Sequence, residues 1–386
     1  MRHRSTTREA GFSLMEMVVA MALGTIVLGA AVQIYIQGLN ATMTVSQRAE
    51  LQQDFRAASN MLTKDLSLAG AGLGQGAAIQ LPTSSSLPKI GCDQTNTCYI
   101  NSTYETYPVQ GSTPFLYGLM PGYNKGPTLL AAQGPTDVIT VAYTDSTFYL
   151  DCYNASVASA TSVTFILPSS TSTNCTAPGT TTPQNVNDGA VGLSAGDLIW
   201  FSFQNGSQVV AEVTGAVTST TTGGVTTYTV PFAATDPLNM NQPSTSPKSL
   251  STVATGTAGY ANRLQVVTYY LDNSVSPARL MRQVSGHSPI PVAENTVFMK
   301  FSYNLFNTNT TTVAIGCTNP GASSDGCSGA SAGMLPNQVT QINIANMAMD
   351  SSLQSSQYGQ GNGYQRMDLQ TSVSARNLTY VNNFSN

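Results

Sequence analysis

The feature that most constrains this chain is a long apolar run close to its N-terminus. The stretch from Met17 to Ile36 carries no charged side chain. As an α-helix it is about 30 Å long, enough to cross the hydrocarbon core of a bilayer. Arg2, Arg4 and Arg8 precede it. Basic residues are retained on the cytoplasmic side, so the sequence predicts one membrane crossing with a short cytoplasmic head.

Two residues beside this run are unusual for a signal sequence or a plain anchor. A secretory signal peptide carries its small-residue cleavage site after the apolar region, whereas Gly11 lies before it. Glu16 is the only charged residue between Phe12 and Ile36, and an unpaired carboxylate in such an apolar segment costs several kcal/mol. If the chain were cut after Gly11, the new amine on Phe12 could meet Glu16 of a neighbouring subunit. The pattern therefore indicates removal of a leader and a pairing role for Glu16.

The segment Gly11-Phe12-Ser13-Leu14-Met15-Glu16 resembles the cleavage and methylation motif of type IV prepilins and type II secretion pseudopilins. The resemblance implies that prepilin peptidase, a membrane aspartyl protease, cuts after Gly11 and methylates the new N-terminal Phe12. It also implies that Glu16 neutralises the amine of the adjacent subunit during assembly. Met15 stands where isoleucine is more usual, which leaves processing plausible. The alternative is a signal anchor with a chance glutamate.

The helix is predicted to continue beyond the membrane. Apolar residues recur there at three- and four-residue steps, flanked by charged ones such as Lys64 and Asp65; they are Leu51, Phe55, Ala58, Leu62 and Leu66. Glycines at 70, 72 and 74 then end the pattern. We expect one helix from about Phe12 to Leu68, roughly 85 Å long. The expected parts are a cytoplasmic leader (1–11), a transmembrane or filament-core helix (12–38), its amphipathic second half (39–69) and a head (70–386).

The head is predicted to be mainly antiparallel sheet, which makes the fold class α+β. Short β-branched and aromatic runs alternate with clusters of Gly, Pro, Asn and Ser. The expected strands are Asp137–Tyr143, Thr147–Tyr153, Ser162–Leu167, Asp197–Phe203, Gln208–Val213, Val225–Val230, Leu264–Leu271, Arg279–Val284, Thr296–Leu305, Gln338–Met349 and Arg366–Ala375. We expect this sheet to pack against the second half of the helix.

Several head segments are similar to those of PilW-type minor pilins, one branch of the pilin class. They include the runs from Gly134 to Tyr143, from Leu193 to Ile199 and from Val266 to Leu271. Others are the run from Leu280 to Arg282, the segment from Ala293 to Val297 and the segment from Ser374 to Asn377. The segment at about 215–260, rich in Thr, Gly and Pro, has no counterpart and is interpreted as an insertion.

Six cysteines form three local couples: Cys92 with Cys98, Cys152 with Cys175, and Cys317 with Cys327. Six cysteines allow 15 connectivities, and nearest-neighbour pairing is our hypothesis because each pair would close a polar loop. Closing such loops contributes about 2–4 kcal/mol each where the geometry allows. The couples also suggest a compartment outside the reducing cytoplasm.

Composition excludes several classes of function. Charged residues make up 9% of the chain and the net charge is −4, so a direct nucleic-acid partner is not expected. Two histidines leave little for a metal site, and no cofactor is expected. Gly329-Ala-Ser331-Ala-Gly333 fits a nucleophile motif, but no histidine follows it in the sequence. We therefore expect a structural protein, not an enzyme.

The resemblance implies a PilW-like minor pilin that takes part in initiating pilus assembly at or near the tip, supporting motility, adhesion or DNA uptake. The expected partners are prepilin peptidase, other minor pilins, the major pilin, the inner-membrane assembly platform and, before assembly, membrane lipid. The head would lie in the periplasm and later at the pilus or cell surface. Two alternatives remain: a J-type minor pseudopilin of type II secretion, and a signal-anchored envelope adhesin.

Overall fold

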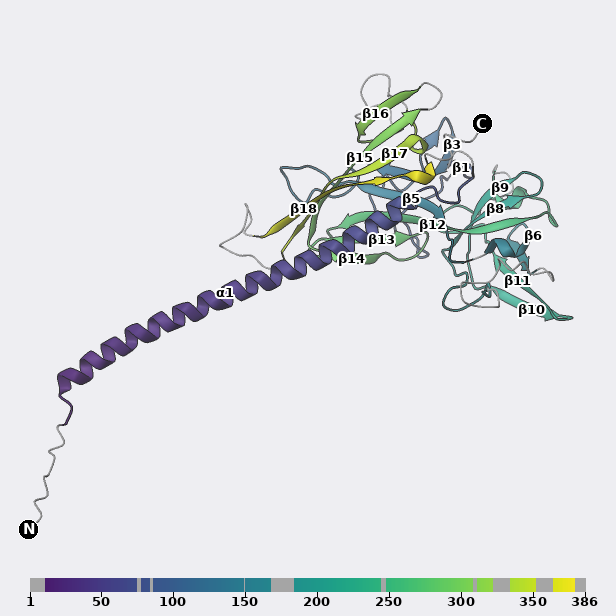
Figure 1. Cartoon of the computed structure of the whole chain (residues 1–386). Coiled ribbons are helices and arrows are strands. Elements are labelled where there is room, and N and C mark those ends of the chain that lie inside the picture. The colour runs from purple at the N-terminus through teal and green to yellow at the C-terminus, as the bar shows by residue number, and fades with distance from the viewer. Residues whose placement is uncertain are drawn as a thin grey trace, which may run out of the picture. The chain divides into compact units, whose positions relative to one another are not determined.

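The computed structural model describes residues 11–74, 78–83, 86–148, 150–167, 184–243, 248–307, 311–321, 334–351 and 364–378 (Figure 1). The chain divides into two compact units. The first comprises Met1–Gln53 and Ser351–Gln365, and the second comprises Asp54–Asp350 and Arg366–Asn386. The long N-terminal helix α1 (Leu14–Ser67) belongs to both units, because the division falls within it.

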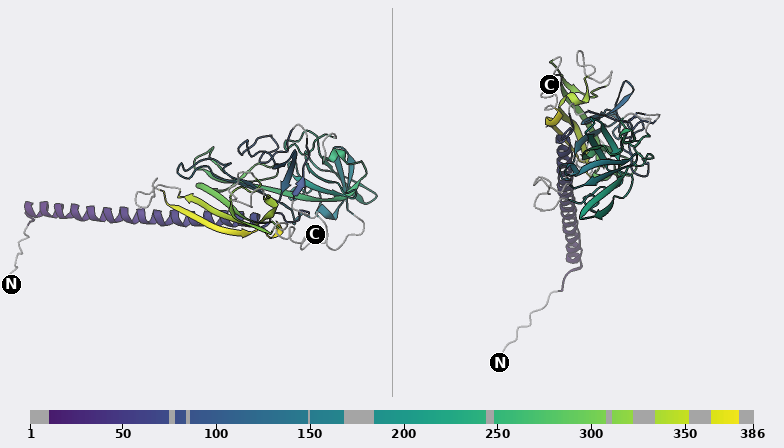
Figure 2. Two further views of the ribbon diagram at one scale, coloured as in Figure 1. Left: turned by 90° about the horizontal axis from the view of Figure 1, so that it is seen from above. Right: turned by 90° about the vertical axis from the view of Figure 1, so that its right-hand side faces the viewer.

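Helix α1 is one continuous ribbon in every view (Figure 2). Its length agrees with the predicted helix to within two residues at the start and one at the end. In the first unit every large apolar side chain from Leu14 to Leu39 is exposed, including Met17, Leu28 and Ile34. The helix is long and apolar enough to cross a membrane. This part of α1 therefore requires an apolar environment that the described part of the chain does not supply.

The last turns of α1 belong to the second unit and bury one face. Phe55, Ala58, Leu62 and Leu66 are all buried, as their three- and four-residue spacing predicts. The helix ends before Gly70, which adopts φ +79° and donates its N–H to the carbonyl of Ala142. A left-handed residue at this point is readily adopted by glycine and stops the helix.

Asp65 departs from the sequence expectation of a charged residue at the flank of this face. Its side chain is 5% exposed and forms an ion pair with Arg282, with Nε and Oδ2 2.7 Å apart. The hydroxyls of Tyr269 and Tyr143 also donate to its two carboxylate oxygens, over 2.7 and 3.1 Å. Asp65 can be buried because Arg282, Tyr269 and Tyr143 of the sheet all donate to its carboxylate.

The described strands form three antiparallel sheets. The first holds β1 (Ala78–Gln80), β2 (Val109–Gln110) and β3 (Thr113–Tyr117). The largest has eleven strands: β4 (Leu119–Gly122), β5 (Val138–Thr144), β6 (Asn154–Ser159), β7 (Ser162–Ile166), β8 (Leu198–Phe203), β9 (Gln208–Glu212), β10 (Thr218–Thr222), β11 (Val225–Pro231), β12 (Ala258–Asp272), β13 (Arg279–Val284) and β14 (Ile290–Glu294). The third holds β15 (Thr296–Asn307), β16 (Thr312–Cys317), β17 (Val339–Asp350) and β18 (Arg366–Ser374). A long helix followed by antiparallel sheets confirms the predicted α+β class.

Strand β12 organises the largest sheet. It pairs with β6 and β8 near its start, with β5 in its middle and with β13 at its end. An aromatic cluster lies over one face of β6 to β9 and β11, where Phe201 stacks on Phe203 and meets Phe232 edge to face. The apolar side chains of these strands alternate toward this cluster, as Val163 and Phe165 do in β7.

The strand predicted at Thr147–Tyr153 is wrong. A 3-10 turn occupies Leu150–Cys152, and strand β6 begins at Asn154. Asp145 accepts hydrogen bonds from the N–H and hydroxyl of Thr147, at 2.8 and 2.6 Å. Such local side-chain bonds compete with a strand ladder and favour a turn. Leu150 points into the core from the turn, which explains its apolar character.

Several short strands were not expected, among them β1 to β4, β6, β10, β14 and β16. The segment at about 215–260 contains β10, β11 and the first residues of β12. Strand β11 pairs with β7 from Thr227 to Pro231, so this segment extends the largest sheet.

Candidate functional site at the start of helix α1

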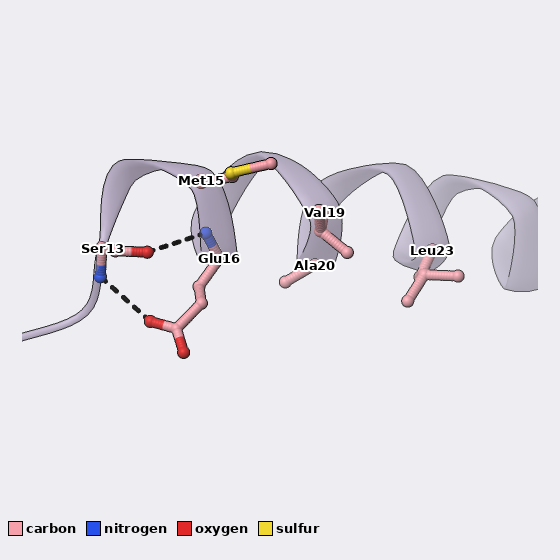
Figure 3. Close-up of a pocket in the computed structure, with 6 residues that line it drawn as sticks. All are labelled: Ser13, Met15, Glu16, Val19, Ala20 and Leu23. Atoms are coloured by element: carbon pink, nitrogen blue, oxygen red, sulfur yellow. Dashed lines mark hydrogen bonds between the residues drawn. The ribbon is translucent and has the colours of Figure 1, made fainter.

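The first turn of α1 is closed by a reciprocal pair of hydrogen bonds (Figure 3). The backbone N–H of Ser13 donates to Glu16 Oε2 over 3.0 Å, and the N–H of Glu16 donates to Ser13 Oγ over 3.2 Å. The carbonyl of Ser13 accepts the first helical bond, from Met17. This arrangement is a capping box, in which each side chain satisfies a backbone donor that the helix leaves unpaired.

The capping box keeps the predicted cleavage bond outside the helix. Gly11 and Phe12 have no helical conformation, and the Phe12 side chain is 92% exposed. A Cβ atom added to Gly11 would have nothing within 4 Å. Proteases act on extended, accessible backbone, and the geometry of this bond suits such an enzyme.

Glu16 lies on a mainly apolar face of helix α1. An open groove on this side of the helix is lined by Ser13, Met15, Glu16, Val19, Ala20 and Leu23. Glu16, Ala20 and Leu23 share one helix face because they are three or four residues apart. In Figure 3 one carboxylate oxygen of Glu16 is bonded to Ser13 and the other carries no marked bond. The carboxylate can thus accept a further donor, such as an amine, while it caps the helix.

Sequence reasoning identified Gly11, Phe12 and Glu16 but overlooked Ser13 as a capping partner. The signal was present, because Ser13-Leu14-Met15-Glu16 fits the S-x-x-E pattern of a capping box. The structure brings Ser13 and Glu16 together, and it places Phe12 just ahead of them. The amine that cleavage would create on Phe12 would therefore lie one residue before the cap.

The remaining predicted site residues are cysteines of the head. Cys92 and Cys98 form a disulfide that closes a short polar hairpin, with their Cα atoms 3.9 Å apart. Cys152 and Cys317 are also disulfide-bonded. Their proposed partners, Cys175 and Cys327, lie outside the described residues, as does the Gly329–Gly333 motif. Within the described ranges no group of three or more His, Cys, Asp or Glu side chains could hold a metal ion.

Comparison with known families matches residues 6–32 to the prokaryotic N-terminal methylation motif. The match spans the second half of the leader, with Arg8, the Gly11–Phe12 bond, Glu16 and most of the apolar run. No curated protein matches the chain, and no solved structure does. The chain thus carries a prepilin-type N-terminal methylation motif, which supports a type IV pilin-like or pseudopilin role.

Proposed function

We propose that this chain is a minor type IV pilin of the PilW kind, a structural subunit that takes part in initiating pilus assembly at or near the tip. The observation that carries the proposal is the position of Glu16. Its carboxylate lies on an exposed apolar helix, four residues after Phe12 of the accessible Gly11–Phe12 bond. The prepilin-type motif over the same residues supports this interpretation.

In the proposed mechanism prepilin peptidase hydrolyses the Gly11–Phe12 bond and methylates the new amine. Before assembly the apolar half of α1 lies in the inner membrane and the head lies in the periplasm. During assembly this half of α1 moves out of the lipid and packs against the apolar helices of other minor pilins or of the major pilin. This transfer takes place at the inner-membrane platform. An amine and a carboxylate attract strongly in such low-dielectric surroundings, so Glu16 selects the axial position of the next subunit.

The capping box suggests how Glu16 acts without unfolding the helix start. One carboxylate oxygen holds the N–H of Ser13, and the other can accept the amine of a neighbouring subunit. A glutamine at this position keeps an acceptor for the cap, because Glu and Gln both serve in capping boxes. It cannot neutralise an ammonium group. Glu16→Gln therefore separates the capping role from the charge role.

The proposal is tested by following Glu16→Gln in native cells from which surface filaments are sheared. We expect normal leader removal, with the amount of variant in filaments reduced more than tenfold, since about 1.4 kcal/mol already gives that factor. The matched control is Glu50→Gln, which removes another exposed carboxylate of α1. Normal incorporation of Glu16→Gln would contradict the charge role. A parent protein confined to membranes would instead favour the J-type pseudopilin, and one with an uncut leader would favour the anchored adhesin.

A further inference from the structure

We propose that the outer edge of β10 is a docking edge at which a second copy of this chain adds its own β10. The inference is independent of the role of Glu16. It concerns the hairpin of β10 and β11, which lies at one end of the largest sheet (Figure 1).

The hairpin is regular and presents β10 fully to solvent. Thr222 pairs with Val225 across the two-residue turn Gly223-Gly224, whose φ angles are +59° and +82°. These positive values are those of a type I′ turn, which demands glycine or asparagine. All five residues of β10 are exposed, whereas Tyr228 and Val230 of β11 are buried in the aromatic cluster. The strand is held in place by its partner and leaves its other edge open.

The alternation of hydrogen bonds identifies the backbone groups at the open edge. The pair beside a two-residue turn exchanges both of its backbone bonds, so Thr222, Thr220 and Thr218 point theirs toward β11. Ser219 and Thr221 must then direct their N–H and C=O groups outward. In the described residues no strand pairs with this edge. The side-chain hydroxyl of Ser219 accepts a hydrogen bond from the side-chain amide of Asn187 over 3.2 Å.

This edge lacks the devices that usually prevent pairing with another chain. Natural edge strands carry charges, proline or a bulge. The sequence of β10 is Thr-Ser-Thr-Thr-Thr, and its register with β11 has no bulge. Threonine is β-branched and favours strands. The edge is therefore suited to strand addition.

The strand is self-complementary about Thr220. In an antiparallel pairing with a second copy, Ser219 would lie opposite the partner's Thr221 and exchange backbone bonds with it. Thr220 would then face itself on the two-fold axis, as a pair without backbone bonds. Threonine opposite threonine or serine stabilises such ladders, and a two-fold arrangement closes as a dimer. No charges oppose one another in this register.

We expect a weak dimer, because pairing through five residues buries much less than the roughly 1,200 Å² of a stable interface. Anchoring both copies by α1 in one membrane or micelle would raise their effective concentration. A covalent trap is consequently a better test than a measurement of solution mass.

The test is disulfide trapping of the full-length chain with Thr220→Cys in detergent and in native membranes. Cα atoms of a pair without backbone bonds lie about 4.5 Å apart, inside the disulfide range of about 4.4–6.8 Å. Every native cysteine that the structure describes is already oxidised. We expect rapid dimer formation through the new cysteine, identified by mass spectrometry of the linked peptide. The matched control is Thr227→Cys, which lies opposite Thr220 on β11 but away from the edge.

A second variant adds Thr221→Pro to Thr220→Cys. Proline on an edge strand is tolerated where the N–H points to solvent, so the hairpin keeps its bonds to β11. It removes an outward donor that strand addition requires. We expect trapping to fall at least about tenfold while the thermal unfolding curve of the head stays unchanged. Trapping of Thr220→Cys no faster than of Thr227→Cys, or unaffected by the proline in a folded chain, would overturn the proposal.

Discussion

At the residue scale, the least ordinary feature of the head is a pair of buried carboxyl groups. Glu212 is fully buried, and its carboxyl accepts the N–H of Leu238 over 3.0 Å and the side-chain amide of Gln94. Asp236 lies beside it and accepts the N–H groups of Met240 and Asn241. Burial, followed by the hydrogen bond and charge of Asp236, raises the pKa of Glu212 to about 9. Glu212 therefore keeps its proton at neutral pH.

This proton makes the stability of the head depend on pH. The pKa of Glu212 is raised in the folded state, so its contribution is complete below the unfolded value of about 4.3 and is lost as the pH rises toward 9. Across that window we expect the free energy of unfolding to fall by about 1.4 kcal/mol per pH unit from this group. Glu212→Gln should make the free energy of unfolding depend less on pH. This free energy is measured by denaturation at several pH values, followed by the fluorescence of the single tryptophan, Trp200.

The matched control is Glu105→Gln, which removes a carboxyl from a half-buried position of the same head. We expect this control to keep the slope of the parent chain. A Glu212→Gln variant with the parent slope would show that Glu212 does not cause the pH dependence. The sequence contains both residues of the pair but gives no sign of their meeting, since 24 positions separate Glu212 from Asp236. Tertiary structure alone brings β9 beside the loop that follows β11.

At the element scale, the docking of the last turns of α1 combines an apolar face with one buried ion pair. The apolar spacing was readable from the sequence, and Phe55, Leu62 and Leu66 are buried as predicted. The role of Asp65 could not be read from the sequence, because its partners Tyr143, Tyr269 and Arg282 come from three distant strands. Burial, followed by the charge of Asp65, raises the pKa of Tyr269, which keeps its hydroxyl protonated as a donor. An apolar stripe tolerates sliding by a turn, whereas a buried ion pair specifies one register.

We predict that Asp65→Asn lowers the free energy of unfolding of the head by about 3 kcal/mol, because it leaves the Arg282 charge buried without a counter-charge. Asp54→Asn makes the same chemical change at an exposed position of α1 and should change stability by less than about 0.5 kcal/mol. Chemical denaturation of the detergent-solubilised chain, followed by Trp200 fluorescence, compares the two. Equal effects of both variants would contradict the proposed register role.

The strands were predicted unevenly for a physical reason. Long runs of alternating apolar residues, such as those of β15 and β17, were located to within two residues, whereas β12 begins at Ala258, six residues before the predicted start. Strand β10 was missed because all its side chains are polar and exposed, so no alternation marks it. A strand was wrongly predicted at the turn Leu150–Cys152 because its apolar residues pack in the core without belonging to a strand ladder.

At the scale of the whole molecule, the sequence predicted a class but not a topology. A basic leader, an apolar helix and a β-rich head were all readable from local patterns. That β12 would pair with β5, β6 and β8 could not be read from the sequence, because these contacts join segments far apart in the chain. Helix α1 begins with apolar side chains that are exposed over several turns. The processing of the start of α1 is therefore the step to measure first.

Cleavage of the Gly11–Phe12 bond is measured by mass spectrometry of the N-terminal peptide, from the chain isolated from native cells. We predict a peptide that begins at Phe12 and carries a methyl group on its amine. A substitution at Gly11 should leave the leader in place, with Met1 or Arg2 at the terminus. A parent chain that retains residues 1–11 in every fraction would contradict leader cleavage and favour a signal-anchored envelope protein.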